Sequence, residues 1–225
     1  MGEKPIKFSV KTIGSWAFYS CSNLKSITLL DGVTTIGYCA FGICSSLSNI
    51  TIPESVTYIG EGAFSVNLSL VSITIPGSVT SIAKNTFSYC YALTNVEIQE
   101  GVIIIEQLAF DQCTALKSIT IPKSVALIGE KAFSGCRALT TVDISQGFTE
   151  ICSRAFEFCT SLTDINITGV KSLGSEVFTK CEKLSILTYN GEYNEWRHVV
   201  KASDWDQYMN MTSTYTVAYR ENSGV

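Results

Sequence analysis

The stretch Leu116-Lys-Ser-Ile-Thr-Ile-Pro-Lys-Ser-Val-Ala-Leu-Ile-Gly-Glu-Lys-Ala-Phe-Ser-Gly-Cys136 decides the fold of this 225-residue chain, because it is one copy of a repeat that fills most of the sequence. Phenylalanine recurs six times at a spacing of 23 residues and then once at 22. The phenylalanine column is Phe18, Phe41, Phe64, Phe87, Phe110, Phe133, Phe156 and Phe178. A leucine follows each of these residues by six positions. Copies that stay in register over this length indicate a stack of near-identical rungs.

Each copy can be interpreted physically. In Ile119-Thr-Ile121 two aliphatic residues alternate with a threonine, which is typical of a short half-buried strand. Proline cannot donate a ladder hydrogen bond, so it ends that strand in the copies that carry Pro53, Pro76 and Pro122. A second short extended segment, V-x-x-I-G, follows, and we expect its glycine to supply a positive φ in a tight turn. The glycines concerned are Gly14, Gly37, Gly60, Gly129 and Gly174.

The segment A-F-x-x-C completes each copy, and we expect it to form one helical turn with the phenylalanine filling the coil. A period of 20–29 residues built on L-x-x-I-x-I is typical of leucine-rich-repeat solenoids. The sequence therefore predicts a solenoid of the α/β or mostly β class. It is a right-handed stack of about eight 23-residue rungs with short strands, tight turns and single helical turns. We assign residues 1–188 to the solenoid, with a partial first rung, and residues 189–225 to a C-terminal capping segment.

The repeat resembles a known family. The string L-x-x-I-x-I-P-x-x-V-x-x-I-G-x-x-A-F-x-x-C looks like the BspA-like leucine-rich repeats of bacterial and protozoan surface proteins, over roughly residues 8–190. Tyr189-Asn-Gly-Glu-Tyr-Asn-Glu-Trp196 is similar to the segment that often closes such arrays. The resemblance implies an extracellular or cell-surface protein that adheres to host proteins, such as extracellular-matrix or plasma proteins. It implies no catalysis and no cofactor.

Composition excludes several other classes of function. The formal net charge is −4 and no Lys/Arg run occurs, which argues against a nucleic-acid partner. Apolar runs are too short for a membrane span, and no signal peptide is apparent. Paired carboxylates, nucleophile–base pairs and phosphate loops are missing, so we expect no enzyme. We expect a monomer, because a solenoid buries its core between its own rungs.

The nine cysteines suggest a ladder of thiols. Seven of them share one column, in which Asn67 occupies the remaining copy. The column is Cys21, Cys44, Cys90, Cys113, Cys136, Cys159 and Cys181, with Cys39 and Cys152 outside it. No C-x2-C pair exists and His198 is the only histidine, so we expect no zinc site. We interpret the column as reduced, buried apolar filler; a disulfide from Cys113 to a neighbour is the alternative.

Function is expected on the outward face of the first strand of each copy, here called the outer strip. Its first column is Ser26, Asn49, Ser72, Asn95, Ser118, Thr141, Asp164 and Ile186. Its second column is Thr28, Thr51, Thr74, Glu97, Thr120, Asp143, Asn166 and Thr188. The strip is hydroxylated at its N-terminal end and acidic around Glu97, Asp143 and Asp164, which favours a basic partner surface.

We predict that ligand binding on the outer strip, treated as a concave face, uses Thr51, Thr74, Glu97, Thr120, Asp143, Asp164 and Asn166. The opposing interpretation is that Ser and Thr are simply polar residues compatible with strands. A Ca²⁺ site from Asp143 and Asp164, on adjacent rungs, is a further alternative, although we expect no metal. Asn-x-Ser/Thr sequons occur at Asn49, Asn67, Asn166 and Asn210, but a glycan at Asn49 or Asn166 would block the strip.

Two regions depart from the repeat. Trp16 stands in a column that is polar in most copies, and we expect it to pack on the N-terminal arm around Phe8. The C-terminal segment holds Trp196 and Trp205 with five tyrosines, Tyr189, Tyr193, Tyr208, Tyr215 and Tyr219. We interpret that segment as a cap; the alternative is a glycan-binding platform. The function predicted from the sequence is a surface or secreted protein-binding module, with a structural spacer or the glycan platform as alternatives.

Overall fold

The computed structural model describes residues 10–144, 149–192, 197–204 and 216–220, and its strands form two rows. The even-numbered row is β2 (Ser26–Thr28), β4 (Asn49–Thr51), β6 (Ser72–Ile75), β8 (Asn95–Ile98), β10 (Ser118–Ile121), β12 (Thr141–Ile144), β14 (Asp164–Asn166), β16 (Ile186–Glu192) and β18 (Thr216–Arg220). The odd-numbered row is β1 (Thr12–Ile13), β3 (Thr35–Ile36), β5 (Tyr58–Ile59), β7 (Ser81–Ile82), β9 (Ile104–Ile105), β11 (Leu127–Ile128), β13 (Thr149–Ile151), β15 (Val170–Leu173) and β17 (Val200–Lys201).

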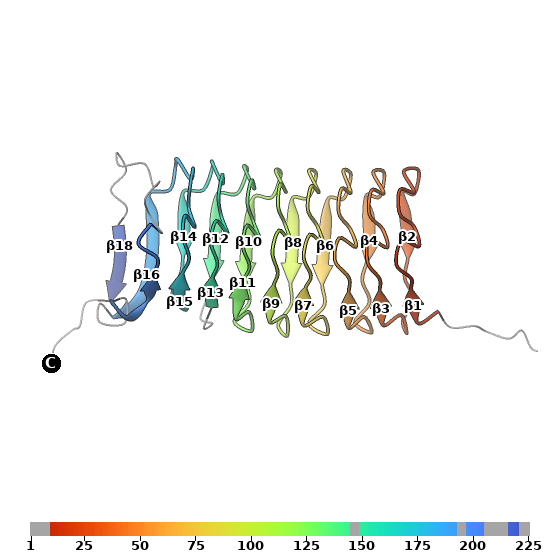
Figure 1. The fold of residues 1–225 in the computed structure, drawn as a ribbon, viewed down its shortest axis with the longest axis horizontal. Coiled ribbons are helices and arrows are strands. Elements are labelled where there is room, and N and C mark those ends of the chain that lie inside the picture. The colour runs from red at the N-terminus through yellow and green to blue at the C-terminus, as the bar shows by residue number, and fades with distance from the viewer. Residues whose placement is uncertain (1–9, 145–148, 193–196, 205–215, 221–225) are drawn as a thin grey trace, which may run out of the picture.

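Within both rows the paired strands are parallel, and most residues pair with the residue at the equivalent position of the neighbouring copy. Ile27 pairs with Ile50, and Ile119 pairs with Val142, so equivalent residues of neighbouring copies lie side by side. Figure 1 shows the rungs following one another along a single axis, with the even-numbered and odd-numbered strands as separate rows. The predicted leucine-rich-repeat solenoid is therefore confirmed, as a parallel-strand coil of about eight turns.

Strand alternation fixes which side chains enter the core. In β6, β8 and β10 exposed and buried residues alternate strictly. The aliphatic residues point inward, and the Ser, Thr, Asn and Glu residues point to solvent. This is the period-2 pattern expected of a strand with one buried face.

The A-F-x-x-C segment is not the expected helical turn. Its backbone forms turns, and three amides in each copy from Phe18 to Phe156 donate to the next rung. Around Phe110, for example, the amides of Leu108, Phe110 and Gln112 donate to the carbonyls of Glu130, Ala132 and Ser134 at 3.0, 2.8 and 2.7 Å. This segment is thus a third inter-rung ladder, which a helix could not provide because its amides bond within the helix.

Positive φ angles make the third ladder possible. The residues two before and two after each phenylalanine have positive φ in every copy, and most of them are not glycine. Leu108 and Gln112 have φ of 59° and 58°. A non-glycine residue costs roughly 1–2 kcal/mol in this region, so the inter-rung hydrogen bonds must offset that strain.

The expected role of the V-x-x-I-G glycine is wrong, because none of Gly14, Gly37, Gly60, Gly129 and Gly174 has a positive φ. At four of these positions the backbone of the preceding rung is too close to leave room for a Cβ. A Cβ on Gly37 would lie 2.5 Å from the backbone nitrogen of Ser15, and Gly60, Gly129 and Gly174 meet the same obstacle. Ala83, Glu106 and Cys152 replace glycine in the other three copies. The Glu106 carboxylate accepts bonds from the Ser81 hydroxyl (2.7 Å) and the Lys84 amide (3.1 Å).

A stack of phenylalanine rings runs through the core. From Phe18 to Phe156 successive rings are nearly parallel, with centroids 5.1–5.4 Å apart, and the last pair lies at 6.0 Å. The rings of Phe41 to Phe178 are fully buried. The spacing follows the distance between rungs, so each ring packs on the ring of the previous copy.

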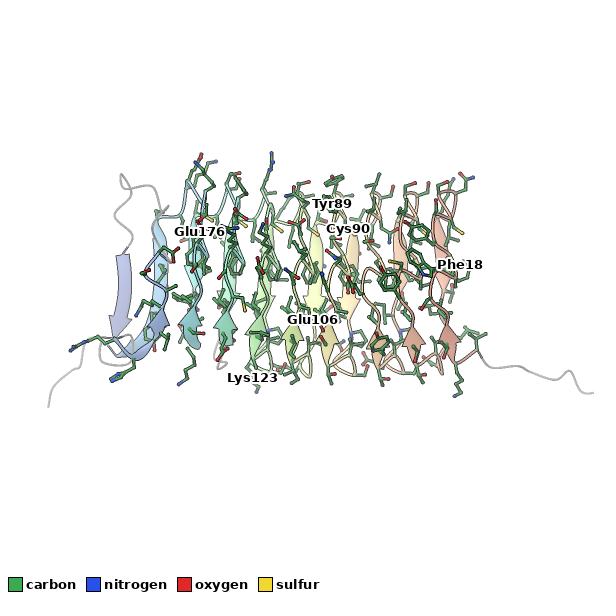
Figure 2. All side chains as sticks on the ribbon, in the orientation of Figure 1. Phe18, Tyr89, Cys90, Glu106, Lys123 and Glu176 are labelled. Atoms are coloured by element: carbon green, nitrogen blue, oxygen red, sulfur yellow. The ribbon has the colours of Figure 1, made fainter. Side chains whose placement is uncertain are left out.

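All nine cysteines are free thiols, and those from Cys44 onward in the main column are buried. They do more than fill space, as the sequence interpretation assumed. Each of the six buried thiols of the main column, from Cys44 to Cys181, donates a weak S–H bond to the carbonyl of the phenylalanine in the preceding rung, as from Cys90 to Phe64 (3.2 Å) and from Cys113 to Phe87 (3.3 Å). Figure 2 shows Cys90 and Tyr89 close together at one edge of the coil, and of the two Cys90 is buried and Tyr89 exposed.

Asn67 reproduces the cysteine contact where the column is broken. Its side-chain amide donates to the carbonyls of Phe41 (3.1 Å) and Phe64 (2.9 Å). Asn67 is completely buried, so its sequon is closed to a glycan in the folded protein. The sequon at Asn210 lies outside the described residues.

The C-terminal strands extend both rows beyond the repeats. β17 pairs with β15, and β18 pairs with β16 in the register Ile186 to Thr216. β16 itself crosses the boundary at residue 188/189 that the sequence suggested. The capping role of residues 189–225 stays a prediction, since much of that segment lies outside the described residues.

Trp16 does not stand alone on the surface. It is 49% exposed, and its ring meets the edges of Tyr19 and Tyr38 at centroid distances of 4.5 and 4.9 Å. Tyr19 and Tyr38 are the aromatic neighbours that the structure gives it. The expected partner Phe8 lies outside the described residues.

Mutation can test the assignment of the two faces. Phe110→Ala should lower the free energy of unfolding by about 3–5 kcal/mol, since it leaves a cavity inside the ring stack. Thr74→Ala, on the outer strip, should cost less than about 0.5 kcal/mol. Urea unfolding followed by circular dichroism measures both. Equal losses for the two variants would contradict the assignment.

Thiol labelling can test the cysteine ladder. In the native protein an aromatic disulfide reagent should react rapidly with Cys21, which is exposed, and more slowly with Cys152, which is half-buried. Cys90, Cys113, Cys136, Cys159 and Cys181 should react only after addition of denaturant. Cys21→Ser is the control and should remove the rapid phase alone. Rapid labelling of more than two native thiols would show that the ladder is open to solvent.

The same ladder predicts an alkaline limit to stability. Burial raises the pKa of Cys90 from 9.0 to about 12, and it raises the pKa of Cys113, Cys136 and Cys159 as well. A raised pKa in the folded state stabilises the protein below pH 9, and this stability is lost as unfolded thiols ionise above it. The free energy of unfolding should therefore fall between pH 9 and pH 11. A flat profile there, measured under reducing conditions, would contradict the prediction.

Candidate functional site

The outer strip is a continuous surface along the even-numbered row. Thr51 (β4), Thr74 (β6), Glu97 (β8) and Thr120 (β10) are exposed, and Asp143 (β12) is half-exposed. Asp164 and Asn166 are half-exposed on β14. The register places Thr74 beside Glu97, Thr120 beside Asp143 and Asp143 beside Asn166. The structure thus brings the seven predicted residues onto one face, although it does not test whether they bind a ligand.

Hydrogen bonds along the strip orient its acidic groups. The Thr74 hydroxyl donates to Glu97 Oε2 at 3.1 Å. The Asn166 amide donates to Asp143 Oδ1 at 3.0 Å, while Asn166 Oδ1 accepts from the amide of Thr168 at 3.1 Å. Asp143 is therefore already engaged by its neighbour, whereas Glu97 is held at only one of its oxygens.

A groove of about 740 Å³ opens in the strip between β8 and β10. Its lining is Asn95, Val96, Glu97, Ile98, Glu100, Ser118, Thr120, Pro122 and Lys123. The even-numbered row parts at this point: β8 pairs with β6, β10 pairs with β12, and no ladder pairing joins β8 to β10. Val96 and Ile98 line the groove and remain buried, at 7% and 8% exposed against 2% and 0% for Ile119 and Ile121.

A missing hydroxyl accompanies the parting of the strands. Before β8 and before β12, Thr94 and Thr140 donate their side-chain hydroxyls to the preceding rung, at 3.2 Å to Val71 O and 3.0 Å to Lys117 O. The equivalent residue before β10 is Lys117, which has no hydroxyl to donate in this way. The side-chain hydrogen bond that Thr94 and Thr140 make to the preceding rung is therefore absent at Lys117, beside the groove.

The turn that follows β8 is also unusual. Where three other copies have Pro after the strand, this one has Gln99-Glu100-Gly101. The Glu100 carboxylate accepts bonds from the backbone amides of Lys123 (3.3 Å) and Ser124 (3.2 Å) in the next rung. Gly101 has a φ of 117°, and a Cβ there would lie 2.3 Å from the carbonyl oxygen of Gly77.

Sequence reasoning missed Glu100, Pro122 and Lys123 as groove residues, together with Val96 and Ile98. The available signal was the loss of the Pro at Gln99 and the following Glu-Gly pair. That departure was visible, but its consequence depends on how two rungs meet.

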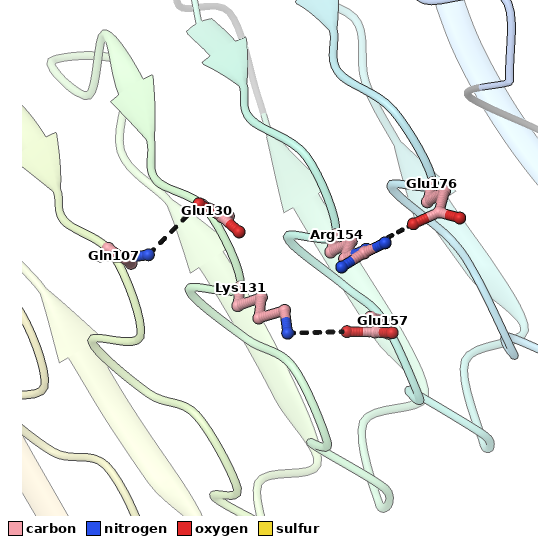
Figure 3. Close-up of polar contacts among 6 residues, drawn as sticks. All are labelled: Gln107, Glu130, Lys131, Arg154, Glu157 and Glu176. Atoms are coloured by element: carbon pink, nitrogen blue, oxygen red, sulfur yellow. Dashed lines mark hydrogen bonds and ion pairs between the residues drawn. The ribbon is translucent and has the colours of Figure 1, made fainter.

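A second charged region lies on the turn edge, over the later rungs (Figure 3). Lys131 pairs with Glu157 at 3.8 Å, Arg154 pairs with Glu176, and Gln107 donates to Glu130 at 3.2 Å. Each contact joins neighbouring rungs, so this region is explained by local stabilisation, at up to about 1 kcal/mol per exposed pair.

The same edge contains Asp111, which is largely buried. Burial raises the pKa of the Asp111 carboxyl, and contacts with Ser134 and the nearby Lys131 oppose that rise. Its neighbours are structural groups of the turn, and no nucleophile–base pair accompanies it in the part of the chain that the structure describes.

The Ca²⁺ alternative for Asp143 and Asp164 gains no support. In the described ranges no three His, Cys, Asp or Glu side chains gather closely enough to hold a metal ion. Asp143 Oδ1 instead accepts from Asn166, whose sequon nitrogen is thereby engaged in the strip.

The aromatic C-terminal platform cannot be located. Trp196, Trp205, Tyr193, Tyr208 and Tyr215 lie outside the described residues, while Tyr189 is buried at the end of the repeats. Across the described part of the chain, no helix has the length and apolar character needed to cross a membrane.

Comparison with known families agrees with this geometry. A family model described as a BspA type leucine rich repeat region, with six copies, matches residues 4–93 and 80–199. The chain belongs to the BspA type leucine-rich repeat family. Among curated proteins no sequence matches this BspA type chain.

Several solved structures are similar to this BspA type solenoid. The T. pallidum leucine rich repeat protein TpLRR is 27% identical, with a TM-score of 0.58, over 73% of this chain and 72% of TpLRR. The pneumococcal vaccine antigen PcpA is 18% identical, with a TM-score of 0.64, over 93% of this chain and 60% of PcpA, a likeness that shows the fold alone. A leucine rich cell surface protein of Faecalibacterium prausnitzii A2-165 is 27% identical, with a TM-score of 0.44, over 86% of this chain and 80% of that protein.

Proposed function

We propose that this chain is a non-enzymatic protein-binding module of a surface or secreted protein, an adhesin that meets its partner through the outer strip. The strip would form the concave face predicted from the sequence, and the module would act as a monomer. The observation that carries the proposal is the continuous exposed row of polar side chains on β4 to β14, opened at its middle by the groove between β8 and β10.

Two further points support it. Leucine-rich-repeat solenoids typically bind proteins, and the matching family is of this kind. Charged side chains on the turn edge form ion pairs between neighbouring rungs. On the outer strip Glu97, Thr120 and Thr51 are exposed to solvent. A spacer needs no such surface, and it would tolerate any change of charge along the strip.

Binding to a panel of immobilised extracellular-matrix and plasma proteins tests the proposal. The test variant reverses three charges on the strip, with Glu97, Asp143 and Asp164 changed to Lys. Saturable binding by the native chain should fall at least about tenfold in this variant, because basic partner groups would meet cations in place of carboxylates.

A matched control changes three exposed acids away from the strip, Glu54, Glu150 and Glu182, to Lys. Both variants alter the net charge equally, so the control should keep the native affinity. Equal losses in both variants would reveal a non-specific charge effect. Absence of saturable binding to any panel protein would count for the spacer.

A further inference from the structure

The groove between β8 and β10 has a mixed chemical lining. Val96, Ile98 and Pro122 supply aliphatic surface, while Asn95, Ser118 and Thr120 supply neutral polar groups. The charged groups are two carboxylates and one ammonium, from Glu97, Glu100 and Lys123. Such a lining suits a ligand with an apolar stem and a polar, positively charged end.

Both carboxylates are held in place before any ligand arrives. Thr74 donates to Glu97 Oε2 from the preceding rung, and the amides of Lys123 and Ser124 hold Glu100 from the following rung. Three successive rungs therefore orient the two acids. Preorganised acceptors reduce the entropic cost of binding, which matters for a small site on an open surface.

Neither acid is neutralised by a neighbouring cation. In the described ranges the ion pairs join Lys131 to Glu157 and Arg154 to Glu176, and neither involves the groove. Lys123 is held to Glu100 through its backbone amide, and Figure 2 shows it at the corner of its rung, on the opposite edge of the coil from Tyr89. The floor of the groove thus keeps a net negative character.

We propose that this groove is a subsite for a single arginine or lysine side chain of the protein partner. The aliphatic stem would pack over Val96, Ile98 and Pro122, and the cationic head would meet Glu97 and Glu100. Arginine fits better than lysine, because its planar guanidinium can bond two carboxylate oxygens at once. The proposal rests on the proposed function and names the partner group that the strip recognises.

The size and shape of the groove favour one side chain over an inserted strand. Ladder pairing is absent between β8 and β10, as it also is between β4 and β6, but both pairs beside the groove, β6 with β8 and β10 with β12, keep their full register. An anionic ligand would meet two carboxylates, and a metal ion would lack a third ligand of the usual kind.

Short peptides test the subsite directly in the isotopically labelled full chain. The probe is acetyl-Gly-Arg-Gly-amide, and amide chemical shifts are followed by NMR as the peptide is added. Saturable shifts should be confined to residues 95–100 and 118–124. The citrulline peptide, which has nearly the same shape without the charge, should bind at least about tenfold more weakly, and a glutamate peptide should produce no saturable shifts in the groove.

Two variants and a control assign the interaction to the groove. Glu97→Gln keeps the shape of the side chain and should lower the affinity for the arginine peptide about tenfold. Glu100→Gln should lower this affinity as well. Glu150→Gln, a matched change of an exposed acid on β13 away from the strip, should leave its affinity unchanged. Thermal melts of each variant establish that the solenoid is intact.

Equal binding of the arginine and citrulline peptides, shifts outside the groove, or an unchanged affinity in Glu97→Gln would overturn the proposal. Failure here is distinguishable from failure of the proposed function. If a panel protein loses binding when the strip charges are reversed, but the arginine peptide causes no shifts in the groove, the subsite is refuted and the proposed function is supported. If the arginine peptide shifts amides of the groove but no panel protein binds, the subsite is supported and the proposed protein-binding function is not.

Discussion

The distance between rungs is the constraint on which this structure depends. Two rows of strands and the ladder of the A-F-x-x-C turn bond neighbouring copies along the stack, and they must share one spacing. The phenylalanine rings, 5.1–5.4 Å apart through most of the stack, show the same spacing inside the coil. Every side chain that lies between rungs therefore has to fit this repeat distance, and glycine stands where even a Cβ would touch the backbone of the preceding rung.

The third ladder explains why strained backbone is tolerated. Val66, Tyr89 and Phe158 hold positive φ angles that their side chains disfavour. Their amides donate to the next rung at 2.8 Å, and the same geometry turns the alternate residues inward, where phenylalanine and cysteine pack. The buried thiols and Asn67 complete this turn by donating to phenylalanine carbonyls. Local strain is thus balanced by contacts that exist only because the copies are stacked.

The groove shows how a repeat can carry a specific site. Two small departures from the repeat mark this junction: Lys117 stands where the neighbouring copies have Thr, and Gln99-Glu100-Gly101 stands where they have Pro-x-Ser. Lys117 lacks the hydroxyl with which Thr94 and Thr140 bond the preceding rung, whereas Glu100 and Gly101 keep hydrogen bonds to the next rung. The surrounding rungs stay in register, so the opening remains local and its two carboxylates keep their supports. The groove arises where two adjacent copies differ, while the rest of the stack holds them in place.

The sequence by itself determined the period, the inward columns from Phe18 to Phe178 and the outer strip, because strand alternation and a fixed repeat assign each residue to a face. It also predicted the thiol column, but not that each thiol donates to a carbonyl one rung away. Only the tertiary structure decided three matters: that A-F-x-x-C forms a ladder, that the glycines serve close approach, and that β8 and β10 part. Each of these depends on distances between residues about 23 positions apart, which local pattern does not contain.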